Sequence, residues 1–143
     1  MTLLKAISDR DGEALEEMLA EDVVFHSPVQ TYRGRAQVVR LLVTVGGVLD
    51  GVEVTRELDG VTFFSARVEE HPVDGILDQH GREDGRITEL TLMLRPLAQL
   101  QAAVARMARR WLIRASSVAA RLVLGEHRQR HEPGTTWVSR ARC

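Results

Sequence analysis

The segment Leu19–Arg35, LAEDVVFHSPVQTYRGR, decides the fold of this chain because it combines a helix end, a strand and a turn. Upstream of it, apolar residues from Leu4 to Leu19 recur at helical spacing, with a break at Asp9–Gly12. We expect the helix to close at residues 20–22. The apolar run Val23–Phe25 then predicts a short buried strand.

The end of this strand carries polar side chains. Pro28 cannot donate to a sheet ladder and restricts Ser27 to extended geometry, so the strand should end near His26. Strand ends and the turns beyond them are places where a scaffold presents side chains to a ligand. His26 is therefore the first candidate functional residue.

This segment, with Tyr32–Arg35 opening a second helix, resembles the SnoaL-like branch of the nuclear transport factor 2-like (NTF2-like) superfamily. Gly85–Leu90 and Leu94–Leu97 resemble its last strand and closing helix, so the resemblance covers roughly residues 3–112. It implies an α+β fold, in which a cone-shaped, curved antiparallel sheet packs on N-terminal helices and holds a ligand pocket in its open end. The superfamily mixes several classes of enzyme with binding modules, so the fold does not name a reaction.

The middle of the chain predicts a meander of four strands, at residues 52–58, 61–69, 73–79 and 86–95. The dipeptide Asp59-Gly60 is typical of a tight hairpin turn between the first two. Alternation groups Leu90, Leu92 and Leu94 on one face of the last strand, and by resemblance this face looks into the cone. Phe64 is expected to point inward from the second strand.

The C-terminal third differs from the rest in charge. Residues 1–95 hold 10 Lys/Arg against 18 Asp/Glu, whereas residues 96–143 hold 9 Arg against 2 Glu. From Pro96 to Leu124 the pattern predicts an amphipathic helix with Arg106, Arg110, Arg114 and Arg121 opposite its apolar face. That face comprises Leu97, Leu100, Val104, Met107, Trp111, Ala115, Val118 and Leu122.

We therefore predict a domain at residues 1–112 and a basic helical extension with a disordered tail at residues 113–143. The apolar face of the extension must be covered by the domain's own sheet, by a second subunit or by an anionic membrane surface. Nucleic-acid binding is not favoured, because Trp137 is the only aromatic residue in the tail for base stacking.

Length and composition limit the other possibilities. A chain of 143 residues with 44% hydrophobic content can bury one core. It shows neither a secretion signal nor a long apolar run, which predicts a cytoplasmic protein. The single cysteine, Cys143, can form no internal disulfide, and the pair His127 and His131 lacks a metalloprotease motif. We predict no metal and no cofactor.

The resemblance also allows the family's catalytic positions to be compared residue by residue. Ketosteroid isomerases of this superfamily carry a proton-transferring aspartate directly before the proline, and Ser27 occupies that position here. A hydroxyl without an adjacent base cannot take up a carbon-bound proton near neutral pH. The family's tyrosine and protonated acid align with Leu3 and near Leu77, with Asp78 on the opposite face. A steroid-isomerase mechanism is therefore not expected.

The epoxide hydrolases of the superfamily use an Arg-x-Asp pair on a strand, which Arg67-Val68-Glu69 mimics. Alternation turns Arg67 and Glu69 outward, and the second acid expected near Leu92 is missing. An exposed ion pair is the better interpretation. Asp74 and Asp78 lie too far apart on one strand to share a proton, so they are read as an acidic solvent face.

Two candidate catalytic residues remain, each with a structural alternative. His26 could act as a general base or donate to a bound carbonyl, or it could be a histidine satisfied by a backbone carbonyl. Tyr32 could orient a ligand or pack against the second helix. If the protein is an enzyme, the two side chains should converge on one polar point inside the pocket.

The sequence thus favours a protein that binds a small apolar molecule, polyketide-like or terpenoid-like, and forms a homodimer across its sheet. The predicted ligand-binding residues are Phe25, Ser27, Phe64, Leu90, Leu92 and Leu94. One alternative is a cyclase- or isomerase-like enzyme that uses His26 for acid–base chemistry. Another is docking to a partner or an anionic surface through the basic C-terminal helix.

Overall fold

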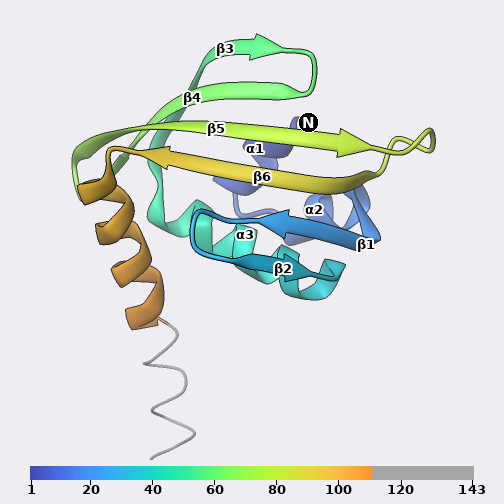
Figure 1. The fold of residues 1–143 in the computed structure, drawn as a ribbon, viewed down its shortest axis with the longest axis horizontal. Coiled ribbons are helices and arrows are strands. Elements are labelled where there is room, and N and C mark those ends of the chain that lie inside the picture. The colour runs from blue at the N-terminus through green and yellow to red at the C-terminus, as the bar shows by residue number, and fades with distance from the viewer. Residues whose placement is uncertain (111–143) are drawn as a thin grey trace, which may run out of the picture. The chain divides into compact units, whose positions relative to one another are not determined.

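Two short helices begin the chain in a computed structural model that describes residues 1–110 (Figure 1). Helix α1, Leu3–Ser8, is capped by the Thr2 hydroxyl, which accepts from the Lys5 amide at 3.2 Å. Helix α2, Gly12–Met18, is capped by the Asp11 carboxylate, which accepts from the Ala14 amide at 3.1 Å. The predicted break at residues 9–12 is confirmed.

The helix end predicted at residues 20–22 is wrong, because strand β1, Leu19–His26, starts directly after α2. Leu19 and Ala20 are completely buried, and Leu19 is in register with Ile87 of strand β6. A partner strand distant in sequence therefore overrides the local helical spacing. The predicted position of His26 at the strand end is confirmed.

A short strand that the sequence did not predict follows β1. Strand β2, Thr31–Arg33, pairs antiparallel with β1, so Tyr32 and Arg33, which were expected to open the second helix, belong to a hairpin arm. Helix α3, Arg35–Val48, then starts where the second helix was expected. Its buried face includes Val38, Leu42 and Val45.

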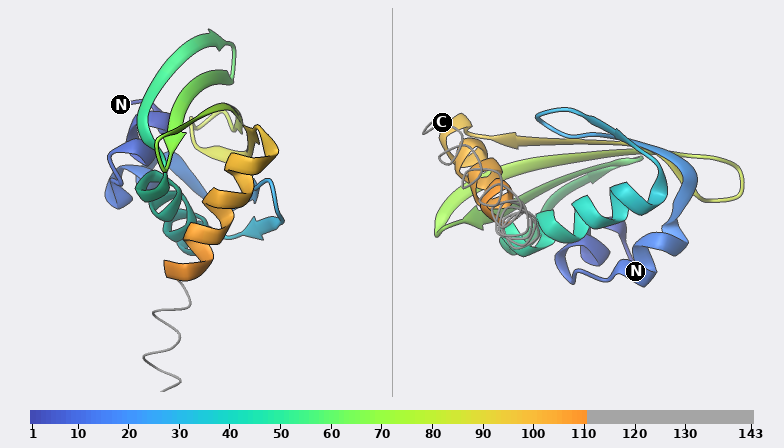
Figure 2. Two further views of the ribbon diagram at one scale, coloured as in Figure 1. Left: turned by 90° about the vertical axis from the view of Figure 1, so that its left-hand side faces the viewer. Right: turned by 90° about the horizontal axis from the view of Figure 1, so that it is seen from below.

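The predicted meander is present as four strands: β3, Asp50–Leu58; β4, Val61–Val68; β5, His71–Gly81; and β6, Ile87–Arg95. The sheet order is β2-β1-β6-β5-β4-β3, in which β1 and β6 run parallel and the other neighbours antiparallel. The sheet is curved, and α1, α2 and α3 lie against the same face of it (Figures 1 and 2). The α+β fold with a curved sheet on N-terminal helices is confirmed.

The core lies between this face of the sheet and the helices. The inward orientation of Phe64, Leu90 and Leu92 is confirmed, with exposures of 1%, 0% and 5%. Phe64 lies opposite Gly75 of β5, and a Cβ at Gly75 would come within 2.1 Å of the Phe64 ring. Glycine at this position therefore lets the aromatic ring lie directly on the neighbouring backbone.

The chain is helical from residue 97 to the last described residue, 110, as the proline before it predicted. The expected apolar face is partly wrong, because Leu97 is 65% exposed whereas Ala103 is buried. Ala102 and Met107 also pack on the core, so the packed face of this helix is rotated toward Ala103. Leu97 lies in the first turn beyond the sheet, where the core offers it no apolar partner.

The compact unit formed by the sheet and its helices spans Met1–Met107. The boundary predicted after residue 112, the apolar positions from Trp111 onward, His127, His131 and Cys143 lie outside the described residues. Up to residue 110, the chain contains no helix long and apolar enough to span a bilayer.

The turn between β4 and β5 holds two non-glycine residues in the left-handed region. Val68 pairs with His71, which leaves Glu69 and Glu70 as a two-residue turn with φ of 50° and 69°. Such turns favour Asn-Gly, because side chains other than those of glycine and asparagine strain the left-handed backbone. The missing glycine explains why the sequence did not mark this turn.

Replacing Glu70 with glycine should therefore stabilise the protein. We expect E70G to raise the free energy of unfolding by about 1 kcal/mol, because it removes left-handed strain. The control E83G makes the same change in the β5–β6 turn, where Glu83 does not have positive φ. Urea denaturation should show stabilisation by E70G alone, and an equal or opposite response of the two variants would contradict the assignment.

Candidate functional site

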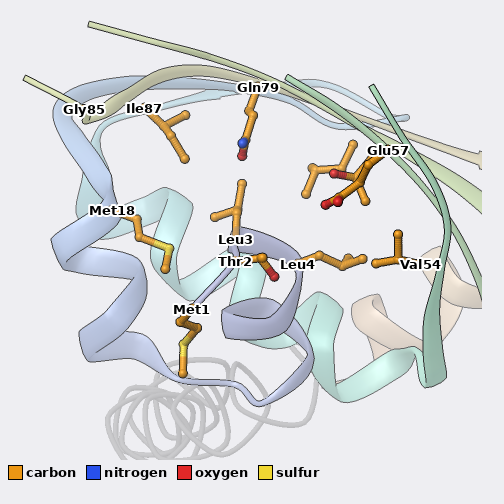
Figure 3. A pocket seen from close by; sticks show the side chains of 12 residues that line it. Met1, Thr2, Leu3, Leu4, Met18, Val54, Glu57, Gln79, Gly85 and Ile87 are labelled. Carbon is orange, nitrogen blue, oxygen red and sulfur yellow. The ribbon is translucent and has the colours of Figure 1, made fainter. Parts of the chain in front are cut away.

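A pocket of about 270 Å³ lies between α1 and the concave face of β3, β4 and β5 (Figure 3). The start of β6 and the end of α2 close one side of it. Seven of the twelve lining residues are apolar, whereas polar atoms form about half of the wall surface, and three side chains from the sheet supply polar groups. The lining residues are Met1, Thr2, Leu3, Leu4, Met18, Val54, Glu57, Thr62, Leu77, Gln79, Gly85 and Ile87.

Strand alternation places the residues of β4 and β5 in this wall. Leu77 is buried and lines the pocket, so Gln79, two residues further along β5, projects from the same face. Thr62 of β4 is in register with Leu77. These three side chains therefore belong to the inner face because of the regular pleat alone.

A β-bulge places the residues of β3. Val54 pairs with Phe64 and Arg56 with Phe63, so β3 has one extra residue at this point. Beyond the bulge Glu57 pairs with Thr62, and it lines the pocket together with Val54. Without the bulge, residues 54 and 57 would lie on opposite faces. The irregularity therefore turns a carboxylate toward an apolar cavity.

The polar groups of the wall differ in their partners. The Thr2 hydroxyl already accepts the capping hydrogen bond from Lys5. The Gln79 Oε1 atom is buried and has no hydrogen-bond partner within the described residues. Figure 3 shows the Gln79 amide and the Glu57 carboxylate pointing into the pocket above Leu3 and Leu4. An unpaired buried amide oxygen, in a wall that also carries a carboxylate, is the distinctive chemical feature of the site.

A second pocket, also of about 270 Å³, lies on the other side of α1 and shares Thr2, Leu4 and Val54 with the first. Its charged residues Lys5 and Asp9 form an ion pair at 3.1 Å. The charged groups of this second pocket are therefore already paired with each other.

The predicted ligand-binding residues do not line the first pocket. Phe25, Phe64, Leu90 and Leu92 are packed in the core, and Leu94 is partly buried against it. The pocket lies further toward the starts of β1 and β6 than the sequence suggested. The role of the predicted ligand-binding residues in binding a ligand stays a prediction.

The two predicted catalytic residues lie on opposite faces of the sheet. Tyr32 pairs with Phe25 and stacks on its ring, with centroids 6.3 Å apart, so it belongs to the core side. His26, next to Phe25, faces outward, where Nδ1 lies 3.1 Å from the Thr31 hydroxyl and Nε2 lies 3.6 Å from Glu89. The expected convergence of His26 and Tyr32 on one polar point is not found.

Ser27 holds the turn between β1 and β2. Its hydroxyl accepts from the amides of Val29 and Gln30 at 3.2 and 3.1 Å, and it donates to the Gln30 carbonyl at 2.8 Å. All the hydrogen-bonding capacity of the hydroxyl is thereby engaged. The side chain that replaces the family's catalytic aspartate has a structural role.

The acidic face predicted on β5 is confirmed on the outer side of the sheet. Asp74 forms an ion pair with Arg95 at 3.1 Å, and Asp78 lies 3.3 Å from the His80 ring. In residues 1–110, no three His, Cys, Asp or Glu side chains gather as a metal site requires. These groups are separated from the pocket by the sheet.

The sequence could have identified Gln79 but not Glu57. Gln79 follows Leu77 at the strand period on a face already recognised as inward, so a polar residue there was a detectable signal. Glu57 is three residues from Val54, so regular strand alternation would place the two on opposite faces, and no local sequence pattern indicates the bulge between them. Its role became visible only from the pairing of β3 with β4.

Comparisons with known proteins agree with this architecture. The family model described as a SnoaL-like domain matches residues 2–90. A steroid delta-isomerase structure from Pseudomonas aeruginosa has 36% identity and a TM-score of 0.72, covering 79% of this chain and 88% of that one. No curated protein matches the chain.

Two further structures extend the likeness. An uncharacterised protein with a cystatin-like fold from Silicibacter pomeroyi has 27% identity and a TM-score of 0.70, covering 74% of this chain and 79% of that one. A de novo designed protein with a curved β-sheet has 18% identity and a TM-score of 0.59, covering 76% and 98%. The designed protein shows the likeness of the fold alone.

The structural role of Ser27 can be tested by removing its hydroxyl. We expect S27A to lower the free energy of unfolding by about 1–2 kcal/mol, because two backbone amides and a carbonyl lose their partner. The control S65A removes a hydroxyl from the outer face of β4, where the structure of residues 1–110 gives it no hydrogen bond, and it should change stability by less than about 0.5 kcal/mol. Equal effects in denaturant titrations would contradict the role of Ser27.

Proposed function

Because the chain belongs to the SnoaL-like family, we propose that it binds a small, largely apolar molecule in the pocket between α1 and β3–β5. Leucine, isoleucine, valine and methionine make up seven of the twelve lining residues, so the apolar part of a ligand would displace water from apolar surface. Ligand pockets of proteins begin at about 300 Å³. A volume of about 270 Å³ therefore favours a compact ligand.

One observation carries this proposal: an apolar cavity contains a buried amide oxygen, Gln79 Oε1, that no described residue satisfies. Buried polar atoms in native proteins almost always have partners, from protein, ligand or water. A bound molecule with an apolar body and one polar group would satisfy both the wall and the amide. This arrangement is typical of binding sites, in which a few polar groups fix the orientation of the ligand.

Catalysis is not part of the proposal. The isomerase relative gives a precedent for proton transfer on this scaffold, yet Leu3 and Leu77 line the pocket where the resemblance places the family's oxyanion donors. Ser27 is engaged in its turn, and His26 faces away from the pocket. Acid–base chemistry through His26 would require a ligand on the outer face of the sheet.

Filling the pocket should abolish binding. We expect V54W to block it, because Val54 lines the pocket from the edge strand and is 51% exposed, so a larger side chain need not disturb the core. The control V29W makes the same change at a 63% exposed position in the β1–β2 turn. The measurement is a ¹H–¹⁵N NMR titration of the full chain with 1-hexanol, a neutral probe.

Amide signals of the pocket residues should shift in the wild type and in V29W but not in V54W. If hexanol left these signals unmoved in the wild type, or if V54W bound it equally well, the proposed site would be wrong. Native mass spectrometry of the purified protein would add the mass of any ligand retained from the cell.

A homodimer across the sheet is the second part of the proposal. Phe63, Ile76 and Met93 are in register across the three strands β4, β5 and β6 and face outward. Met93 is 57% exposed, and the ion pair between Asp74 and Arg95 lies in a neighbouring row. An apolar row bordered by charges of both signs is self-complementary about a two-fold axis, as an isologous interface requires.

A charge at the centre of this row should separate the subunits. We expect M93D to be monomeric when the wild type is dimeric, because the carboxylate would be buried unpaired against its symmetry mate. V29D, a matched change away from this row, should leave the dimer intact. Light scattering after size-exclusion chromatography measures the mass, and a monomeric wild type would refute the dimer.

A further inference from the structure

Two polar groups that face the pocket, the Glu57 carboxylate and the Gln79 Oε1 atom, are hydrogen-bond acceptors without a partner among the described residues. We infer that the ligand presents a hydrogen-bond donor to one or both of these groups, preferably a primary ammonium group at the end of a compact apolar body. This inference rests on the proposed binding function and specifies the chemical class of the ligand. It assigns to the site a polarity opposite to that of an oxyanion-binding pocket, which must supply donors.

The position of Gln79 is fixed by its backbone. The backbone amide of Gln79 donates to the Gly60 carbonyl at 2.8 Å, and Gln79 is in register with Leu90 of β6. These backbone contacts fix the point on the inner face of the sheet from which the Gln79 side chain projects. Its Oε1 atom is buried without a partner among the described residues. A donor group on a ligand would complete the hydrogen bonding of this atom.

Glu57 gives the pocket its charge. Among the side chains that line the pocket in the described part of the chain, that of Glu57 is the only acidic or basic one. An ionised carboxylate accepts hydrogen bonds and cannot donate them. The bulge in β3 holds it on the same side as Val54, at the exposed edge of an apolar wall.

Neighbouring cations do not neutralise this carboxylate. The Arg56 guanidinium lies over the Phe63 ring on the outer face, 5.6 Å from its centroid. Lys5 belongs to the second pocket and pairs there with Asp9. Within residues 1–110 neither of these two cations pairs with Glu57, and the remaining basic group of the wall is the α-amino group of Met1.

These features discriminate among ligand head groups. An ammonium group has three donors and a charge opposite to that of Glu57, so it suits either acceptor and is also attracted by the carboxylate. A hydroxyl can satisfy one of them. A carboxylate or phosphate on the ligand would be repelled by the negatively charged Glu57 carboxylate. Rotation of the Gln79 side-chain amide could offer such a ligand its NH2 group, but no other charge-compensating group.

Three probes with the same six-carbon body separate these possibilities: hexylamine, 1-hexanol and hexanoate, titrated at pH 7 into the full chain with detection by NMR. We expect hexylamine to bind about 5- to 10-fold more tightly than hexanol, and hexanoate to bind most weakly. The preference is modest because Glu57 is partly solvated, where charge pairs are screened.

Two matched variants test whether the Glu57 carboxylate alone causes the preference for the amine. E57Q should reduce the preference for the amine over the alcohol to less than about 2-fold. E53Q makes the same change of charge on the same strand, but Glu53 pairs with Ser65 on the outer face. This control should retain the preference of the wild type.

The outcomes distinguish this inference from the function on which it rests. If hexanol binds in the pocket and hexanoate binds as tightly as hexylamine, the donor assignment is overturned and the binding function stands. If E53Q and E57Q lower the preference equally, net charge rather than the site causes it, which also overturns the assignment. If no probe shifts the pocket signals, the binding function itself fails.

Discussion

The parallel pairing of β1 with β6 is the contact on which the rest of the structure depends. It joins the N-terminal helices and the β1–β2 hairpin to the last strand of the meander, although α3 and the strands β3, β4 and β5 lie between them in the sequence. Because Leu19 is in register with Ile87, the end of α2 is held beside the start of β6. Met18 and Ile87 thereby meet in the wall of one pocket, which neither part could form alone.

The polarity of that pocket depends on an irregularity in the edge strand. A regular β3 would send Glu57 to the solvent face, and the pocket would then contain only the Gln79 amide and two hydroxyls. One extra residue reverses this outcome. Bulges of this kind often re-aim a side chain near a functional site, and here the side chain brings a negative charge to an apolar wall.

The fold and the chemistry of the family are separable in this chain. The likeness to a steroid delta-isomerase extends over most of both chains, whereas the positions that would supply the base and the oxyanion donors hold Ser27, Leu3 and Leu77. Ser27 has a structural role, since its hydroxyl ties the turn that starts β2. A scaffold with a pre-formed pocket can thus lose one set of polar groups and present another from different strands.

The sequence by itself determined the meander and the Asp59-Gly60 hairpin, because these follow from local period and turn chemistry. The family, and with it the inward direction of the face that holds Leu90 and Leu92, came from the resemblance of the sequence. It also indicated that His26 ends its strand. Only the tertiary structure decided that β1 begins at Leu19, that His26 and Tyr32 lie on opposite faces, and that Glu57 faces the pocket. The physical reason is that strand pairing and bulges depend on contacts between residues distant in sequence. Local sequence patterns do not show which residues of two strands pair with each other.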